Sequence, residues 1–446
     1  MSWKRDSLMV RLLVGVCCVM AAVACSPDKK TTTPSNVKQG TAQKADAKKN
    51  SNASKASKDN PAKSTRPKKV AADLGGSGGW PMFRGNRRRT GSADVAGPRE
   101  AKLQWVFRTK GRIYADAAVT KDGKTIYVAS HDHFLYAVDT EGRKKWSFDT
   151  GGKIWTSPAI SDNGDVYVGS DEDALFSVSA DGKMNWKFVT TEAQKKGEPK
   201  PEAGRYDVDT SPLILDDGTI VFGCHLNLIA LRPAAGDLRW AFAAGTGRAK
   251  VFSSVAQSLD GTLFFGTQGN FFFALNQVSE VQWHIETEGD NDSTPVVDLD
   301  GNVYFASDDG VVRSVAPGNK IRWTLDVEAP VRAPLGLSSS GVLYVPTYGQ
   351  APFVAAVDAE TGAEKWRFRV EAGVGDFYGI QSGVITDAKG YAYFGGRDGY
   401  VYCVSPDGQL VWKHKTDDQV DASPVLGPNG TLYVGSDDGR LYAFSR

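Results

Sequence analysis

The sequence has little of the side-chain chemistry on which most enzymes and redox proteins depend. It contains only five cysteines and five histidines among 446 residues, and its one adjacent cysteine pair is Cys17-Cys18. It also contains no C-x-x-C-H haem motif, no phosphate-binding loop and no dinucleotide-binding fingerprint. We therefore predict no catalytic, cofactor-binding or metal-binding residues.

A strong excess of either charge is also absent, because the chain as a whole carries a net charge of +1. The charge is unevenly distributed, however, with +9 in residues 26–72 and −10 in residues 73–446. A nucleic-acid-binding domain needs a basic face for its phosphate contacts. The acidic body of the chain therefore argues against nucleic acid as a partner.

The apolar run over residues 12–24 follows Lys4 and Arg5, but thirteen residues are too few to span a bilayer as a helix. The pattern is typical of a secretory signal peptide. Ala22-Val23-Ala24-Cys25 resembles the lipobox of bacterial lipoproteins, in which the signal is removed before the cysteine and the cysteine receives the lipid. The resemblance implies a signal peptide over 1–24, lipidation of Cys25, and a lipid-anchored place in the cell envelope, on the outer membrane facing the periplasm. Ordinary cleavage with Cys25 unmodified is the alternative.

Residues 25–79 contain no aromatic residue and are dominated by Lys, Ala, Ser, Thr and Asn. Such a segment has too little apolar surface to offset the entropy that folding would cost. We predict that 25–79 is a disordered tether between the lipid-attachment cysteine and a folded domain over 80–446.

The folded domain is built from repeats of one unit. Tryptophans recur at intervals of 40 to 54 residues, at Trp105, Trp146, Trp186, Trp240, Trp283, Trp323, Trp366 and Trp412. Between them, short runs of alternating apolar residues are separated by Asp-Gly or Asn-Gly turns. Four short strands in a period of about 40 to 45 residues are typical of a propeller blade. We predict an all-β, eight-bladed propeller of four-stranded antiparallel blades.

Two features predict how this propeller closes and packs. The last repeat ends at Arg446 without a tryptophan strand, whereas residues 103–107 form an unmatched strand ahead of the first repeat. We expect this N-terminal strand to complete the last blade and so remove an open edge. The Trp-x-Phe pattern puts both rings on one face of the outer strand, where they can pack between adjacent blades. Cys224 and Cys403 fall in strands of distant repeats, so we expect two buried free thiols.

Four repeats end in Gly-x-x-x-Trp, at residues 142–146, 182–186, 236–240 and 362–366. These endings resemble the tryptophan-docking repeats of PQQ-binding-like propellers. Residues 80–86, Trp-Pro-Met-Phe-Arg-Gly-Asn, are similar to the segment that often opens such domains. The resemblance covers residues 80–446 and implies the fold, but the family includes two very different classes of function.

One class is the quinoprotein dehydrogenases, which oxidise alcohols or sugars with pyrroloquinoline quinone and calcium. Their alcohol-oxidising members carry an adjacent cysteine pair against the quinone, and the only such pair here, Cys17-Cys18, lies in the predicted signal peptide. The other class is represented by the lipid-anchored propeller subunit of the outer-membrane β-barrel assembly machinery, which this chain also resembles. That subunit scaffolds a larger complex without catalysis. The lipobox, the tether and the missing catalytic motifs favour this second class. We expect a non-catalytic scaffold without a cofactor, bound to an envelope protein such as that machinery, with the dehydrogenase as the alternative.

The loops that lead into the innermost strands of a propeller meet around its axis. Aligning the repeats on the Ser-Pro step before this strand selects Tyr114, Trp155, Asp209, Phe252, Asp292, Val331, Ile380 and Asp421. Three aromatic and three acidic side chains at one end of the axis are candidates for partner binding. The alternative is that they only fill and cap the channel.

One loop is longer than a blade requires. Trp186 and Pro212 are 26 residues apart, 14 more than the equivalent pair in four other repeats. The excess around residues 192–206 contains the candidate partner-binding residues Lys195, Lys196 and Arg205. Long loops in compact domains are usually functional. We expect this one to project beside Trp155, Asp209 and Phe252, either as a docking flap or as a tolerated insertion.

Two histidine positions raise the question of a chemical role. His131-Asp132-His133 has the spacing of a metal pair, but it has no third ligand in reach and occupies a turn position of the repeat. We expect a surface hairpin there. His414 replaces the phenylalanine of the Trp-x-Phe pattern, and we expect it to be a partly buried packing residue.

Overall fold

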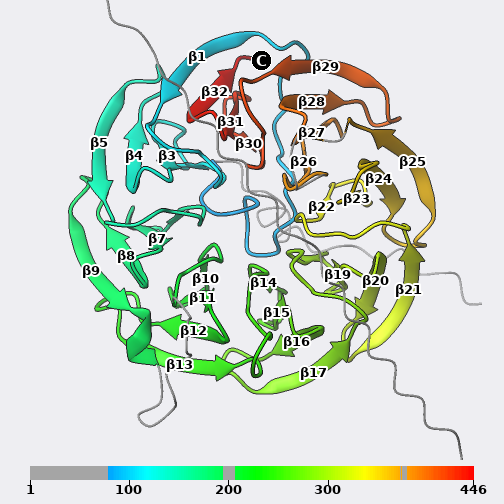
Figure 1. Cartoon of the computed structure of the whole chain (residues 1–446), viewed down its shortest axis with the longest axis horizontal. Coiled ribbons are helices and arrows are strands. Elements are labelled where there is room, and N and C mark those ends of the chain that lie inside the picture. Colours follow the sequence, from blue (N-terminus) through cyan, green and yellow to red (C-terminus); the bar gives the residue numbers. More distant parts are fainter. Residues whose placement is uncertain (1–78, 194–205, 372, 374–378) are drawn as a thin grey trace, which may run out of the picture. The chain divides into compact units, whose positions relative to one another are not determined.

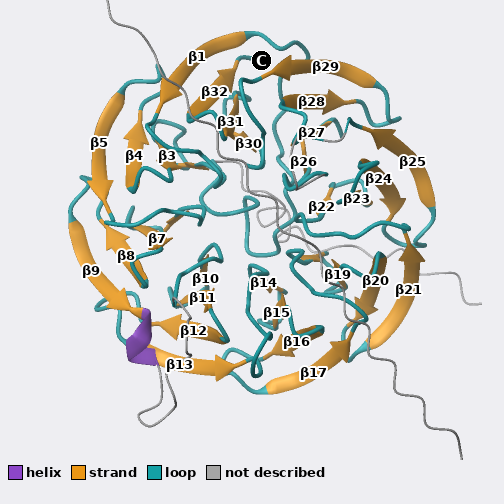
Figure 2. Cartoon of the chain, in the orientation of Figure 1, coloured by secondary structure: helices purple, strands orange, loops and turns teal. Residues whose placement is uncertain are grey.

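Alternating apolar residues and frequent glycine turns fold this chain into short antiparallel strands. The computed structural model describes residues 79–193, 206–371, 373 and 379–446. In them, eight four-stranded antiparallel sheets are arranged as blades around a central axis (Figure 1). The one helical element in the described ranges is the 3₁₀ helix η2 (Thr190–Ala193), drawn purple in Figure 2. The predicted all-β, eight-bladed propeller is confirmed.

Each blade begins with a short strand next to the axis and ends with a longer strand at the rim. From inside to outside, blade 1 comprises β2 (Ala118–Val119), β3 (Ile126–Ala129), β4 (Phe134–Val138) and β5 (Lys144–Asp149); blade 2 comprises β6 (Ala159–Ile160), β7 (Val166–Ser170), β8 (Ala174–Val178) and β9 (Met184–Val189); blade 3 comprises β10 (Leu213–Ile214), β11 (Ile220–Cys224), β12 (Asn227–Leu231) and β13 (Leu238–Ala243); blade 4 comprises β14 (Ala256–Gln257), β15 (Leu263–Gly266), β16 (Phe271–Leu275) and β17 (Val281–Glu286). Blade 5 comprises β18 (Val296–Val297), β19 (Val303–Ala306), β20 (Val311–Ala316) and β21 (Lys320–Asp326); blade 6 comprises β22 (Gly336–Leu337), β23 (Val342–Pro346), β24 (Phe353–Asp358) and β25 (Glu364–Arg369); blade 7 comprises β26 (Ile385–Thr386), β27 (Ala392–Gly395), β28 (Tyr400–Val404) and β29 (Leu410–Lys415); blade 8 comprises β30 (Val425–Leu426), β31 (Leu432–Ser436), β32 (Arg440–Phe444) and β1 (Leu103–Arg108).

Blade 8 is closed by the N-terminal strand. β1 pairs antiparallel with β32, and Trp105 lies opposite Ala443. The two strands come from opposite ends of the chain and lie side by side at the rim of the ring (Figure 1). The strand that the sequence left unmatched therefore completes the last blade, as predicted.

The tryptophans of the outer strands dock on the neighbouring blade. The Trp146 indole Nε1 donates a hydrogen bond to the carbonyl of Ala180 in blade 2 at 2.8 Å. A Cβ atom on Gly182 would lie 2.7 Å from the Trp146 ring, so only glycine leaves room for the indole. Phe148 meets Phe176 of blade 2 edge to face at 5.7 Å. The expected packing of the Trp-x-Phe rings between blades is confirmed.

The segment over residues 80–93 runs inside the ring and links the innermost strands in chain order. Its backbone hydrogen bonds join Trp80 to Val119, Pro81 to Ile160, Arg87 to Gln257, Arg88 to Val297, Thr90 to Leu337 and Gly91 to Thr386. These partners belong to blades 1, 2, 4, 5, 6 and 7. In Figure 1 the segment is the blue loop near the axis. One of its residues, Phe83, lines the cavity at one end of the axis.

Two smaller expectations are also met. Cys224 and Cys403 are free and buried. His414 is half-buried and packs edge to face on Phe444 at 5.0 Å. The part of the chain that the structure describes contains no helix with the length and apolar character needed to cross a membrane.

Candidate functional site

A cavity of about 350 Å³ opens at the end of the axis where the chain enters each innermost strand. Its mouth is lined by one residue from every blade, namely Tyr114, Trp155, Asp209, Phe252, Asp292, Arg332, Gln381 and Asp421. We call these eight residues the upper ring. The structure thus brings together the six aromatic and acidic residues selected from the sequence.

In the two other blades, the residue selected from the sequence stands one position before the residue that lines the cavity. Val331 and Ile380 are fully buried and do not line the cavity; Arg332 and Gln381 do. In repeat six, Pro334 stands one residue before the proline position of the other repeats, so alignment on proline shifted the register. Because side chains of extended backbone alternate, a shift of one residue turns the side chain to the other side.

A second ring lies two residues further along each loop, deeper in the cavity. Its members are joined by hydrogen bonds from the backbone N–H of one blade to the side chain of the next. The bonds run Asp116 to Ser157, Ser157 to Ser211, Ser211 to Ser254, Ser254 to Thr294, Gly383 to Ser423 and Ser423 to Asp116. We call these residues, together with Pro334 of blade 6, the lower ring. The ring is interrupted at blades 6 and 7, because Pro334 has no N–H and Gly383 has no side chain.

The guanidinium of Arg84 occupies that gap. Arg84 is fully buried, and its Nη2 donates to the carbonyls of Leu335, at 3.1 Å, and of Val384. Arg89 is buried beside it and donates from Nε to the Val255 carbonyl at 2.8 Å. Burial lowers the pKa of Arg84 to about 10 and of Arg89 to about 9. Both arginines therefore remain charged at neutral pH and form a cationic plug below the cavity.

Asp116 of the lower ring faces this plug. Its Oδ1 accepts the Ser423 N–H at 2.7 Å, while its Oδ2 is buried without a hydrogen-bond partner. Burial raises the pKa of Asp116 to about 7, although the attraction of Arg84 opposes the shift. The floor of the site is thus a carboxyl group poised between its charged and neutral forms above two arginines.

Several upper-ring residues contact the first residue of the turn between the second and third strands of the preceding blade. Two of these contacts are salt bridges. Arg397 of blade 7 holds Asp421 of blade 8 at 2.8 and 2.9 Å, and Asp308 of blade 5 holds Arg332 of blade 6 at 2.7 Å. Both charges of the first pair are almost fully buried, with exposed side-chain fractions of 10% and 3%. These pairs bind blade to blade and leave no free charge for a ligand.

The other two acids of the upper ring have no such cation. Asp292 accepts a long hydrogen bond of 3.3 Å from Gln268 on Oδ2, and its Oδ1 is buried without a partner. Asp209 meets Asp171, another carboxylate. Burial first, and then the charge of Asp171, raise the pKa of Asp209 to about 6. Burial likewise raises the pKa of Asp292 to about 6.

Aromatic side chains form the remaining wall of the mouth. Trp155 packs edge to face on Tyr114 at 5.2 Å, and the His131 ring lies 4.0 Å from the Trp155 ring. Burial lowers the pKa of His131 to about 4, so it is neutral. His131 was expected on a surface hairpin, but the structure shows it half-buried against the cavity wall, because its turn is the contact point for the next blade. Sequence spacing alone carries no signal for this contact.

The remaining predicted site residues lie outside the described residues. These are Cys25, Lys195, Lys196 and Arg205. The two ends of the long loop are described: the Thr190 hydroxyl donates to the carbonyls of Asp173 and Tyr206, both at 2.8 Å. One hydroxyl therefore ties both ends of the insertion to the blade.

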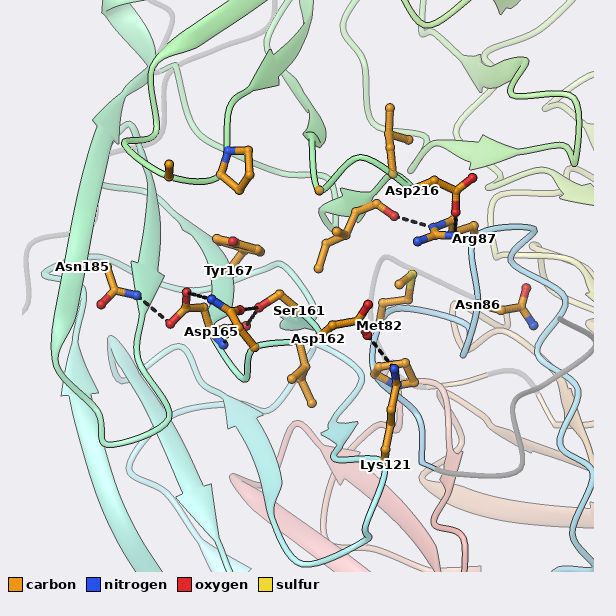
Figure 3. Close-up of a pocket in the computed structure, with 18 of the residues that line it drawn as sticks. Met82, Asn86, Arg87, Lys121, Ser161, Asp162, Asp165, Tyr167, Asn185 and Asp216 are labelled. Atoms are coloured by element: carbon orange, nitrogen blue, oxygen red, sulfur yellow. Dashed lines mark hydrogen bonds and ion pairs between the residues drawn. The ribbon is translucent and has the colours of Figure 1, made fainter. Parts of the chain in front are cut away.

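A larger hollow, of about 850 Å³, lies at the opposite ends of the innermost strands, between blades 2 and 3 (Figure 3). Its polar side chains are paired with one another. Lys121 meets Asp162 at 2.5 Å, Asn185 donates to Asp165 at 2.8 Å, and Arg87 is bound to Asp216. Since its charges are already matched, we take the smaller axial cavity, with its unmatched carboxylates, as the candidate functional site.

The described residues contain no group of three or more His, Cys, Asp or Glu side chains arranged to hold a metal ion. Cys224 is no candidate nucleophile, because burial raises the pKa of its thiol and its Sγ donates to the Tyr206 carbonyl at 3.1 Å. The site itself presents carboxylates and aromatic side chains.

Known proteins resemble this chain in sequence and in fold. The family model described as Outer membrane protein assembly factor BamB matches residues 89–312, 308–391 and 397–446. A protein of that description from Burkholderia pseudomallei (strain K96243) is 27% identical over 140 residues, which are 30% of this chain and 35% of the relative. The chain thus matches only about a third of that relative's length.

Solved structures share the propeller. BamB from Moraxella catarrhalis has a TM-score of 0.62 at 16% identity, with 77% of this chain and 99% of that chain covered. A europium-containing methanol dehydrogenase has a TM-score of 0.70 at 14% identity, with 85% and 100% covered. At such identities the likeness shows the fold alone.

Proposed function

Because the chain belongs to the family of the outer membrane protein assembly factor BamB, we propose that it is a non-catalytic scaffold of the cell envelope that binds a protein partner at the cavity end of its propeller. The observation that carries the proposal is the lining of the axial cavity. Asp292 leaves a buried carboxylate oxygen without a partner, and Asp209 lines the mouth without a hydrogen bond or ion pair to any described residue, beside the rings of Trp155 and Phe252. Aromatic side chains are enriched at the centres of protein interfaces, and a carboxylate among them selects a partner that brings the opposite charge.

The dehydrogenase alternative requires a site for pyrroloquinoline quinone, a tricarboxylate, together with calcium. The residues present do not suit such an anion. Asp209 and Asp292 line its mouth without a cation of their own, and the one arginine of the upper ring, Arg332, is already bound to Asp308. Arg84 and Arg89 lie below the cavity and are not among the residues that line it. Carboxylates facing a tricarboxylate would repel it. The cavity therefore supports a binding role over quinone chemistry.

For the rest of the molecule we propose the arrangement that the sequence suggests. Lipid on Cys25 would anchor the chain to the outer membrane, and residues 25–79 would let the propeller reach into the periplasm. The partner would then be the β-barrel assembly machinery, as the names of its relatives suggest. Nucleic acid is not a partner in this proposal.

The proposal is tested by site-specific photo-crosslinking of the full-length chain in its own envelope. A photoreactive residue at Lys153, exposed beside the cavity mouth, should capture a component of the β-barrel assembly machinery. The same group at Asp300, exposed in a turn at the other end of blade 5, should not capture it. Capture from Asp300 alone, or capture of no assembly component from Lys153, would contradict the proposal.

A second assay addresses catalysis. The purified chain, supplied with pyrroloquinoline quinone and calcium, should show no dye-linked oxidation of alcohols or sugars. Turnover that requires the quinone would favour the dehydrogenase instead.

A further inference from the structure

The charge pairs around the axial cavity follow a pattern with one exception. The preceding blade provides an oppositely charged side chain for two charged residues of the upper ring, Asp421 and Arg332. It provides an amide for a third, Asp292. For Asp209, the preceding blade supplies Asp171, whose negative charge raises the pKa of Asp209. Asp209 thus faces a second carboxylate between blades 2 and 3, at the place where Asp421 faces an arginine and Asp292 faces an amide.

No described side chain neutralises this pair. Asp209 makes no hydrogen bond or ion pair with any described residue, and Asp171 accepts only the Trp155 indole N–H, at 3.2 Å. Lys250 is near enough to lower the pKa of Asp209 but is not within ion-pair distance of it. Across the cavity, Asp116 is only 4% exposed and its Oδ2 is unpartnered. Buried carboxylate oxygens without partners are costly, so a positively charged guest would be strongly favoured.

Aromatic faces stand next to the unmatched carboxylates. Trp155, Phe252 and Tyr114 line the same cavity as Asp209 and Asp292. The face of an aromatic ring attracts cations, and the attraction grows when water is excluded. Carboxylates combined with aromatic rings are the usual surroundings of a bound ammonium or guanidinium group.

We propose that the axial cavity is a binding site for a single cationic group, an alkylammonium or a guanidinium, held by Asp209 and Asp292 against Trp155 and Phe252. A volume of about 350 Å³ admits one such side chain but no folded element. The group comes either from a lysine or arginine of a partner protein or from a free polyamine. The inference rests on the proposed function, since it names the chemical group by which a partner would be held.

Calorimetric titration of the full-length chain tests the site directly. The probes are spermidine and capped tripeptides with a central lysine or arginine; matched peptides with norleucine or citrulline are the neutral controls. The charged probes should bind and the neutral peptides should not. A preference for the peptides would identify a protein side chain as the guest, and a preference for spermidine would identify a polyamine. Failure of every charged probe to bind would overturn the proposal.

Two pairs of variants separate this site from general electrostatics. Asp209→Asn with Asp292→Asn should weaken binding of the charged probes at least tenfold. Asp181→Asn with Asp300→Asn removes the same charge from exposed turns and should leave binding unchanged. Trp155→Leu should weaken binding, whereas Trp155→Phe should retain most of it. Equal binding by the cavity double variant and the wild type would overturn the proposal.

The test of the cation site and the test of the proposed scaffold function can fail independently of each other. If Lys153 still captures an assembly component while no charged probe binds, the scaffold role stands and the cation site fails. If charged probes bind but no assembly component is captured, the site stands and its guest is something other than that partner.

Discussion

The guanidinium of Arg84 fills the space that a side chain on Gly383 would need. A Cβ atom at Gly383 would lie 2.7 Å from Nη1 of Arg84 and 3.0 Å from the Cβ of Pro334. The missing side chain of blade 7 and the buried arginine of the N-terminal segment are therefore two parts of one arrangement. The lower ring is interrupted where the plug passes through it.

Gly383→Ala should accordingly destabilise the fold by about 1 to 3 kcal/mol through overpacking. Arg84→Met should also destabilise it, because two buried carbonyls lose their donor. Urea denaturation of the single and double variants should show the double variant to be less unstable than the sum of the two. Strict additivity would mean that the two residues do not compete for the same space.

The Arg397–Asp421 pair should be essential to stability, not to binding. Arg397→Met leaves the Asp421 carboxylate buried without its cation, at a cost of about 3 to 5 kcal/mol. Arg143→Met breaks the exposed pair with Asp139 and should change the midpoint of urea denaturation little. A small effect of Arg397→Met would show that water reaches Asp421.

The raised pKa of Asp292 makes the stability of the fold depend on pH. The pKa of Asp292 is about 6 in the folded protein and 3.8 in its ordinary state. The folded state therefore holds its proton more tightly, and this carboxyl lowers stability as pH rises from about 4 to about 6. Its charged neighbours are Asp308 and Asp290, which raise its pKa, and Arg332, which lowers it.

Asp292→Asn should consequently stabilise the fold at pH 8 by up to about 3 kcal/mol and leave it unchanged at pH 4. Thermal unfolding at the two pH values measures the difference. The opposite sign at pH 8 would mean that the Asp292 carboxylate is well paired in the folded protein.

Lipid anchoring has a simple biochemical test. Cys25→Ala should abolish incorporation of labelled palmitate and move the protein out of the detergent-dependent membrane fraction. Cys224→Ala, at a buried thiol, serves as the control and should retain both properties. Unchanged fractionation of Cys25→Ala would remove the anchor from the proposal.

The long loop is predicted to be dispensable for folding. Replacing residues 192–204 by a short Gly-Ser link keeps Thr190 and Tyr206, which the Thr190 hydroxyl joins at 2.8 Å. The melting temperature should therefore stay nearly the same. If crosslinking from Lys153 also stays the same, the loop is a tolerated insertion and not a docking flap.

The parts of the fold that repeat were predictable, because eight copies of one pattern reinforce a weak signal. Strand order, blade number, the tryptophan contacts and the closing strand with Trp105 all follow from the period. The six selected ring residues followed as well, wherever the Ser-Pro step or its equivalent fixed the register. Val331 and Ile380 were selected one position too early, because Pro334 of repeat six and Ser382 of repeat seven each stand one residue before the corresponding position of the other repeats.

The parts that do not repeat could not be read from the sequence. Arg84 and Arg89 belong to a segment that occurs once, and nothing in their neighbours shows that they are buried. The sorting of Asp209, Asp292 and Asp421 into unmatched and paired acids depends on the preceding blade. That contact joins residues 24 positions apart for Asp292 and Asp421 and 38 positions apart for Asp209, and it becomes visible only when the blades are placed side by side.

The pairing of β1 with β32 also governs the order of events during biosynthesis. Among the described residues, the first strand to be made must wait for the last, since Phe107 can pair with Leu441 only after residue 441 has been synthesised. Until then β1 and the unfinished eighth blade present open edges that invite aggregation. A chain cut short by even one strand could not shut its ring, so premature termination would be exposed at once to chaperones and proteases.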